Sequence, residues 1–415
     1  MLKPGRARPG IVALLQGDRA GGAAMAAATV AALIWANWPG TVAYRTFWLS
    51  VAPWSGPLGL NLSYRSWVNE GLMLAFFTIV GLEIRREVLA GELRSPRRAL
   101  LPVVAALAGM AIPALIYSAI ELGGPGARAW GIPTATDIAF ALGALALVSR
   151  TGTARGRVFL MTLAIADDIF SILVLAILYS HGVHPLALEL GLGCVAAMVL
   201  VRLCGGPAWP VALLGGLAWW AVLHSGVEAA LVGAAIGLLA PRWRSRPPAR
   251  RPDPSHPGAG RTGPTAARPH AGPRVWELRL QPIVNGGVLP LFAFANAGVR
   301  IAGSGIGSAP ALRIMGAVIA ARLIGKPLAI VTVVWLGRRV GVTSGPGPRT
   351  ALDLGVLAAV GFTVPLLVIR AALPDGPLAA GATAGLLLAT IGGLVLGAAS
   401  VPGSRRRMDR PGRVA

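Results

Sequence analysis

The chain has 415 residues, of which 55% are hydrophobic and only 13% are charged. This balance excludes a water-soluble globular domain and is typical of an integral membrane protein. The formal net charge of +22 does not indicate a nucleic-acid partner, because the arginines lie in loops and in one long linker. Cys194 and Cys204 have no metal-ligand spacing, so they predict neither a disulfide nor a bound metal.

Apolar segments long enough to span a bilayer recur along the chain, and they predict an all-α integral membrane protein with about twelve transmembrane helices. They fall at 20–38, 67–89, 99–120, 132–149, 157–180, 186–203, 209–224, 226–241, 281–299, 311–336, 352–372 and 378–400. Arginines are concentrated after the even-numbered segments, so the positive-inside rule places both termini in the cytoplasm.

The chain divides into two groups of helices. Residues 1–240 are expected to hold helices one to eight, and residues 277–400 are expected to hold helices nine to twelve. Between them, residues 241–276 form a basic linker rich in Pro and Arg, which cannot bury a core and is predicted to be a disordered cytoplasmic tether. Residues 401–415 form a basic cytoplasmic tail.

Residues 40–66 are too polar and too aromatic to cross a bilayer. Their strand-like alternation and the interrupting Pro-Gly predict an extracytoplasmic hairpin, which could form a homodimer contact. An equally good interpretation is that the aromatic residues form an interfacial belt against the lipid.

Three carboxylates lie inside two apolar runs that are joined by a short basic loop. Asp168 lies about 16 Å along its helix from Arg157, at about 1.5 Å per residue, which is near the middle of a bilayer core of about 30 Å. Asp137 reaches a similar depth in the preceding run, and Asp167 adjoins Asp168. Charged groups at that depth are costly and usually functional, so we expect an ion site.

Oxygen ligands suit alkali ions, so Asp167 and Asp168 are the predicted sodium and proton ligands, and Thr136 could add a hydroxyl or a carbonyl. Lys326 is the only lysine within the apolar body. It needs a counter-charge, for which Asp167 is a candidate. A fixed structural ion pair is the competing interpretation for Lys326.

Helix-breaking residues lie in two of the predicted spans. Pro133 and the TATD sequence open the fourth, and Gly361-Phe362-Thr363 followed by Pro365 interrupts the eleventh. Paired interruptions in two halves of a transporter point to a site built from broken helices. The partial charges of opposed helix ends could then be offset by Asp137 and Lys326.

Six motifs occur in order along the chain: VGLEIRREV at 80–88, IPTATDIAFALGALAL at 132–147, LAIADD at 163–168, LPLFAFANAG at 289–298, LIGKP at 323–327 and GFT at 361–363. Together they resemble the NhaA sodium/proton antiporter family. The resemblance implies twelve helices, inverted repeats over helices 3–5 and 10–12, and broken helices 4 and 11 that cross at mid-membrane. It also implies a multi-pass protein of the bacterial plasma or inner membrane.

The resemblance assigns roles to individual residues. Asp167 and Asp168 match the ion- and proton-binding pair, Asp137 and Lys326 match the charges that offset the broken-helix ends, and Thr136 looks like a neighbour of the site. A further set resembles the cytoplasmic cluster linked to pH sensing: Glu83, Arg86, Glu87 and Glu277. Without the resemblance these four would be interpreted as solvated charges at helix ends.

The sequence departs from the family pattern at several positions. Glu228 stands where the family usually has histidine, and we expect it to be exposed and ionised in the turn between segments seven and eight. Pro365 follows GFT in place of the usual residues, and Phe170 and Ser171 follow the aspartate pair closely. These changes concern the pH profile and the ion preference more than the transport core.

The predicted function is therefore electrogenic exchange of sodium or lithium for protons by alternating access, in support of pH and sodium homeostasis, with no enzymatic activity and no cofactor. Two other classes of protein fit the sequence less well. An intramembrane aspartyl protease would need a Gly-x-Gly-Asp pattern, which neither GIPTATD nor LAIADD supplies. A membrane scaffold or sensor would not need two buried aspartates beside Lys326.

Overall fold

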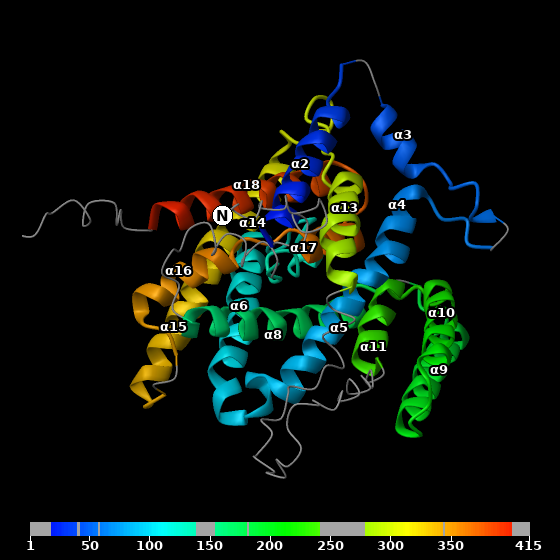
Figure 1. The fold of residues 1–415 in the computed structure, drawn as a ribbon. Coiled ribbons are helices and arrows are strands. Elements are labelled where there is room, and N and C mark those ends of the chain that lie inside the picture. The colour runs from blue at the N-terminus through cyan, green and yellow to red at the C-terminus, as the bar shows by residue number, and fades with distance from the viewer. Residues whose placement is uncertain are drawn as a thin grey trace, which may run out of the picture.

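A computed structural model describes residues 18–39, 42–56, 59–137, 154–180, 182–240, 279–342 and 345–400. Within these ranges the fold is helical apart from one isolated β-bridge (Figure 1). The predicted linker 241–276, Glu277, the tail 401–415 and most of the predicted fourth helix lie outside the described residues.

The helices of the first part follow the predicted apolar segments closely. They are α2 (Asp18–Ala36), α3 (Ala43–Leu49), α4 (Tyr64–Ser66), η2 (Trp67–Leu72), α5 (Met73–Ala90), η3 (Glu92–Arg94), α6 (Pro96–Ile120), η4 (Ala127–Ala129), α8 (Ala154–Leu178), α9 (Pro185–Leu203), α10 (Ala208–Ser225), η5 (Ala229–Leu231) and α11 (Val232–Leu239). The second part holds η6 (Val284–Val288), α13 (Leu289–Asn296), α14 (Ala309–Ala320), η7 (Ala321–Gly325), α15 (Lys326–Arg339), α16 (Pro348–Ala358), α17 (Thr363–Ala372) and α18 (Pro377–Ser400).

The described residues contain seven helices that are long and apolar enough to cross a bilayer. The pair α16 and α17 makes an eighth if it is counted as one broken span, bent by 51°. An all-helical membrane protein with a break in its eleventh predicted segment is therefore confirmed. The count of twelve and the inverted repeats stay predictions.

Helices α9 and α10 pack side by side at the edge of the molecule, and α11 packs against α5 next to them (Figure 1). Gly81 on α5 and Gly233 and Gly237 on α11 allow that contact, because a Cβ atom at any of these positions would overlap the backbone of the facing helix. Small residues at such contacts are typical of membrane helices, whose backbones must approach closely to gain packing energy.

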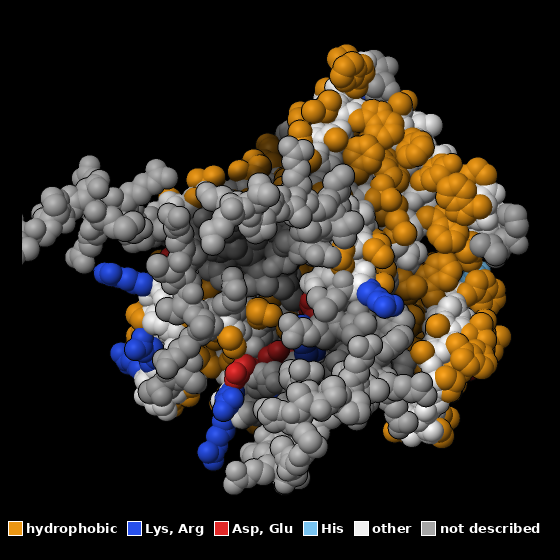
Figure 2. Space-filling model, in the orientation of Figure 1, with side chains coloured by type: hydrophobic (Ala, Val, Ile, Leu, Met, Phe, Trp, Pro, Cys, Tyr) orange, Lys and Arg blue, Asp and Glu red, His pale blue; other side chains and the backbone are white. Residues whose placement is uncertain are grey.

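The other side of the molecule holds the helices that position the candidate site. Helix α6 packs against α8 and α15, and α15 packs against α16. Leu101, Leu160, Leu163, Ile330 and Leu354 form the buried core between these four helices. Apolar side chains also cover much of the outer surface over α2, α3, α9 and α10 (Figure 2), as expected for surfaces that face lipid.

The segment 40–66 is only partly the predicted hairpin. Its beginning is helical, since α3 covers Ala43–Leu49, so the strand-like interpretation of these residues is wrong. The chain does turn back on itself, but the only bridge among the described residues joins Val51 to Ser63. Aromatic stacking explains the difference: Phe47 stacks on Tyr64 with ring centroids 4.9 Å apart, and a helix can present Phe47 to that ring.

Candidate ion-binding site

Two interrupted segments meet in the interior of the molecule. Residues 131–137 form a turn and an extended stretch, and residues 359–362 separate α16 from α17. Thr136 Oγ1 donates a hydrogen bond to the carbonyl of Ala358 at 3.1 Å, and the backbone N–H of Asp137 donates to the carbonyl of Val360 at 3.4 Å. Carbonyls left unpaired at the end of α16 are thus satisfied by the other segment.

Gly361 lies where the two segments approach most closely. A Cβ atom at this position would overlap Nη2 of Arg322 and would lie 2.8 Å from the carbonyl oxygen of Ala135. Any residue other than glycine would therefore push the segments apart.

Arg322 is fully buried and contacts both segments from a third element, η7. Its Nε donates to the carbonyl of Ala359 at 3.0 Å, and its Nη1 donates to the carbonyl of Ile132 at 3.4 Å. A guanidinium at carbonyl ends of broken helices offsets their partial negative charge. Sequence reasoning missed this residue, although an arginine four residues before Lys326 in an apolar run was an available signal.

Helix α8 carries the aspartate pair. Asp167 and Asp168 are exposed by only 0% and 5%, and the apolar residues around them hold α8 helical through 25 residues. Lys326 Nζ donates to Asp167 Oδ2 at 2.9 Å and to Thr136 Oγ1 at 2.9 Å. The predicted partnership of Lys326 with Asp167 is therefore present in the structure as a buried ion pair.

Lys326 reaches the pair because the helix before it is locally widened. The π-helical turn Ala321–Gly325 ends at Lys326, and Pro327 follows. Proline has no N–H to donate to the preceding turn, so a local departure from α-helical bonding is expected there. Arg322 and Lys326 lie four residues apart, a spacing that places both on one helix face, and both are buried.

The side chain of Asp168 has fewer hydrogen-bond partners among the described residues than that of Asp167. Within the described residues Asp168 makes no hydrogen bond, although Asp167, Glu83, Asp137 and Lys326 all act on it electrostatically. Oδ1 of Asp167 is also buried without a hydrogen-bond partner in the described chain. Carboxylate oxygens with free lone pairs in a dry interior can bind a hard cation or a proton.

Asp137 is at the far side of the same cluster. Its Oδ2 accepts a hydrogen bond from Thr363 Oγ1 at 3.0 Å, and its side chain is 5% exposed. Asp137 thus lies at the start of α17, where a carboxylate complements the positive end of a helix.

Three of the four residues that resemble the pH-sensing cluster lie together on α5, and the fourth, Glu277, lies outside the described residues. Oε1 of Glu87 accepts hydrogen bonds from Thr162 Oγ1 on α8 at 3.1 Å and from the N–H of Glu92 at 2.8 Å. Glu83 and Arg86 are half-buried on the same helix, and Glu83 acts electrostatically on Asp168. Glu87 and Glu83 therefore connect α5 to the helix of the aspartate pair.

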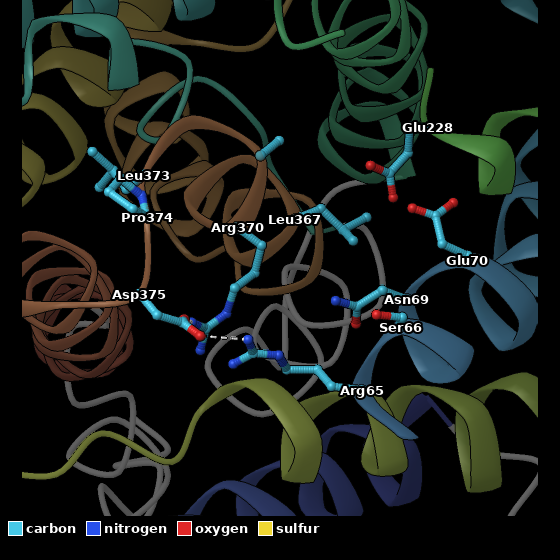
Figure 3. Close-up of a pocket in the computed structure, with 11 residues that line it drawn as sticks. Arg65, Ser66, Asn69, Glu70, Glu228, Leu367, Arg370, Leu373, Pro374 and Asp375 are labelled. Atoms are coloured by element: carbon cyan, nitrogen blue, oxygen red, sulfur yellow. Dashed lines mark hydrogen bonds and ion pairs between the residues drawn. The ribbon is translucent and has the colours of Figure 1, made fainter. Parts of the chain in front are cut away.

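Glu228 lies at the other end of α5 and is not exposed as expected. It is half-buried, and its carboxyl group points toward that of Glu70, beside a cavity of about 340 Å³ that both residues line (Figure 3). Oε2 of Glu70 accepts hydrogen bonds from the N–H groups of Ala229 and Ala230 at 2.8 and 3.3 Å. Sequence reasoning missed Glu70, which lies about 25 Å from Glu87 along one continuous helix at about 1.5 Å per residue.

An unwound segment that meets a helix break beside buried, opposite charges is typical of one class of protein, the membrane transporters. The chain belongs to the Na+/H+ antiporter 1 family, whose model matches residues 13–401.

Similar proteins carry consistent names. An Na(+)/H(+) antiporter NhaA of Acidovorax sp. (strain JS42) is 40% identical over 390 residues, which cover 91% of this chain and 88% of the relative. One of Nocardia farcinica (strain IFM 10152) is 38% identical and covers 99% and 93% of the two chains. A solved structure, the sodium proton antiporter MjNhaP1 from Methanocaldococcus jannaschii, aligns over 94% of this chain and 95% of its own, with 15% identity and a TM-score of 0.48.

Proposed function

We propose that this protein exchanges sodium or lithium for protons across a bacterial membrane, electrogenically and by alternating access. Membership of the antiporter family gives the reaction class, and the buried contact of Lys326 Nζ with Asp167 Oδ2 at 2.9 Å is the observation that carries the mechanism. The side chains of Lys326 and Asp167 are only 1% and 0% exposed. An ion pair buried this deeply is stable only while both charges stay compensated.

The exchange follows from competition for the same oxygens. A cation that enters between Asp167 and Asp168 replaces the ammonium group as the counter-charge of Asp167. Lys326 then loses its partner and releases its proton, and Asp168 releases a second proton as the cation binds. When the cation departs to the other side, protons rebind and the Lys326–Asp167 pair forms again.

Exchange is electrogenic in this scheme because more than one proton is released for each monovalent cation. Asp168 supplies one of these protons and Lys326 supplies the other, because Asp167 is already ionised in its ion pair with Lys326. Protons and sodium compete for the same groups, so transport slows as the medium becomes acidic.

Asp137 and Arg322 have a different role in this proposal. They offset the charges of the helix ends around the crossing, so that the two segments can rearrange relative to α8 without exposing uncompensated dipoles to the hydrocarbon. Thr136 joins the two roles, because it bonds both to Lys326 Nζ and to the carbonyl of Ala358.

Three further features complete the proposal. The chain crosses the membrane with both termini in the cytoplasm, in agreement with the arginine distribution of its loops. The segment 40–66 contacts a second copy of the chain in a homodimer. The linker 241–276 tethers the two groups of helices on the cytoplasmic side.

Everted membrane vesicles that carry the protein test the proposal. Sodium or lithium should dissipate a preformed pH gradient and potassium should not, and the rate should depend on the membrane potential. Asp168→Asn should abolish this response while the protein stays folded and inserted, because an amide neither releases a proton nor supplies a full charge. Glu189→Gln, at an exposed acid on α9, is the matched control and should exchange at the wild-type rate. Wild-type exchange in Asp168→Asn would remove Asp168 from the site.

A further inference from the structure

A second cavity, of about 360 Å³, lies away from the aspartate pair and is lined by four arginines and one aspartate. The arginines are Arg45, Arg65, Arg300 and Arg370, and the acid is Asp375. They come from α3, α4, the chain between α13 and α14, α17, and the turn between α17 and α18. Because residues so distant in sequence bring positive charge to one cavity, we call it the arginine pocket.

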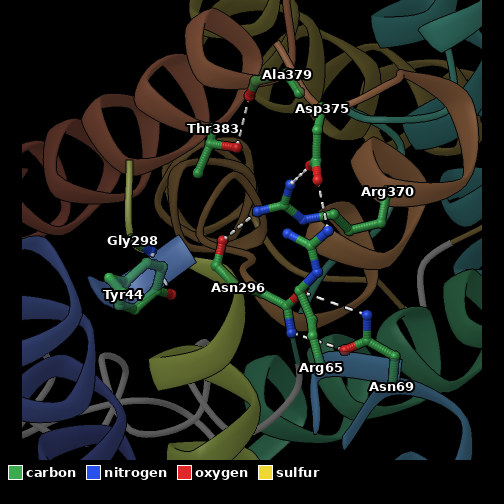
Figure 4. Close-up of polar contacts among 9 residues, drawn as sticks. All are labelled: Tyr44, Arg65, Asn69, Asn296, Gly298, Arg370, Asp375, Ala379 and Thr383. Atoms are coloured by element: carbon green, nitrogen blue, oxygen red, sulfur yellow. Dashed lines mark hydrogen bonds and ion pairs between the residues drawn. The ribbon is translucent and has the colours of Figure 1, made fainter. Parts of the chain in front are cut away.

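The single acid does not neutralise the arginine pocket. Asp375 Oδ2 accepts a hydrogen bond from Arg65 at 2.6 Å, and Oδ1 accepts one from Arg370 at 2.8 Å (Figure 4). Burial alone would raise the pKa of Asp375, but the Arg65 hydrogen bond and the charges of Arg65 and Arg370 lower it below its ordinary value. The carboxylate therefore stays ionised and compensates one of its two guanidinium partners.

Other donor groups of the arginine pocket have no anionic partner among the described residues. Nε of Arg370 is buried without a hydrogen-bond acceptor among the described residues. Arg45 and Arg300 are exposed, and neither forms an ion pair within the described part of the chain. Guanidinium groups that converge on one cavity provide the forked donors that phosphate oxygens accept best.

The start of α18 adds to the positive electrostatic potential of the arginine pocket. Gly376, Pro377, Ala379 and Ala380 line the arginine pocket, and they begin a helix of 24 residues. The first N–H groups of a helix have no acceptor within it, and together with the helix dipole they favour an anion. No acidic side chain occupies the first turn of α18.

The surroundings indicate where the anion comes from. The arginine pocket lies where the predicted spans Tyr64–Ala90 and Pro377–Ala399 begin, which is the level of lipid headgroups. Trp38, Val42 and Phe47 nearby in the chain are 63%, 60% and 43% exposed, and apolar side chains cover this region of the surface (Figure 2). Exposed aromatic residues at the end of a span are typical of the membrane interface.

We propose that the arginine pocket binds a phosphate group, and that the headgroup of an acidic phospholipid supplies it. The net positive charge of the lining favours an anionic lipid over a zwitterionic one. The apolar residues Ala36, Val42 and Val299 in the same lining are suited to the first part of an acyl chain. This inference does not rest on sodium/proton exchange, because lipid binding is measured without transport.

The test is native mass spectrometry of the full-length protein in detergent, titrated with phosphatidylglycerol or phosphatidylcholine. Arg45→Gln with Arg300→Gln removes two lining charges that make no ion pair in the described chain. Arg128→Gln, at an exposed arginine beside η4 and outside the pocket, is the matched control. Melting temperatures of all three proteins should agree, which shows that the fold is intact.

We expect phosphatidylglycerol to bind the wild type and Arg128→Gln equally, and the double variant about tenfold more weakly, as for the loss of a charge-assisted contact. Phosphatidylcholine should bind weakly to all three. Inorganic phosphate is titrated as a competitor: no displacement of the lipid supports the lipid headgroup as the source. If inorganic phosphate displaces the lipid from the wild type but not from the double variant, the pocket is a phosphate site that a soluble anion fills, and the lipid headgroup is not the source. Equal binding of phosphatidylglycerol to wild type and double variant would overturn the proposal.

Discussion

Thr363 Oγ1 donates a hydrogen bond of 3.0 Å to Oδ2 of Asp137, which lies 226 residues earlier in the chain. Thr363 is the first residue of α17, and Asp137 ends the described part of the extended segment 131–137. Both side chains are buried, with 1% and 5% exposure, so water cannot replace the bond. The segment 131–137 and the start of α17 are therefore fixed to each other at this point.

Gly361→Ala should impair both folding and transport. The added methyl group would overlap Nη2 of Arg322 and crowd the carbonyl of Ala135, so the two segments would have to separate. Overpacking of this kind typically costs about 1–3 kcal/mol. Thermal melting in detergent and vesicle exchange measure the two effects. Gly316→Ala, on α14 with open space around its Cβ position, is the matched control and should behave as wild type.

Arg322→Met should lower the melting temperature and the exchange rate together. The carbonyls of Ala359 and Ile132 would each lose a donor, and a buried polar group left unpaired costs about 1–3 kcal/mol. Arg349→Met, at an exposed position on α16, should change neither quantity. An unchanged melting temperature for Arg322→Met would show that the carbonyls find other donors.

Lys326→Ala should destabilise the protein because it leaves Asp167 buried without a counter-charge. Removing one member of a buried ion pair typically costs about 3–5 kcal/mol. The second variant, Lys326→Met with Asp167→Asn, removes both charges and should recover part of the lost melting temperature. If the single variant melts like the wild type, the pair of 2.9 Å does not contribute to stability.

Glu228→His should change the dependence of transport on pH. The new imidazole would face Glu70 in a cavity that Arg65, Arg370 and Asp375 also line. Two facing carboxylates repel each other when both are ionised, whereas an imidazolium attracts Glu70. An unperturbed histidine has a pKa of about 6.5, so the activity profile should move or steepen between about pH 6 and pH 8.

The profile is measured at saturating sodium and compared with that of Glu189→His on the exposed face of α9. Acid still slows the wild type, because protons compete at Asp167 and Asp168. Only the difference between variants is informative. Overlapping profiles for Glu228→His and wild type would leave the aspartate pair as the sensor.

Much of the fold followed from sequence alone because a bilayer leaves few choices. Backbone groups in hydrocarbon must be paired internally, so long apolar runs had to become helices. The break at Gly361 and the burial of Asp167, Asp168 and Lys326 were predictable as well. Glycine is a poor helix former, and charged groups within long apolar runs must find partners in the interior.

Tertiary structure alone decided which charged groups meet. Arg322 and Lys326 are four residues apart and share one helix face, but only the packing brings Arg322 to the carbonyls of Ile132 and Ala359. Glu228 was expected to be exposed, yet the packing of α11 on α5 brings it opposite Glu70. Arg65, Arg370 and Asp375 are scattered single charges in the sequence, and they become one cluster where three segments converge (Figure 4). Hydrophobicity and helical rise act along one segment, whereas these contacts depend on the rotation and offset of one helix against another, which side-chain packing sets.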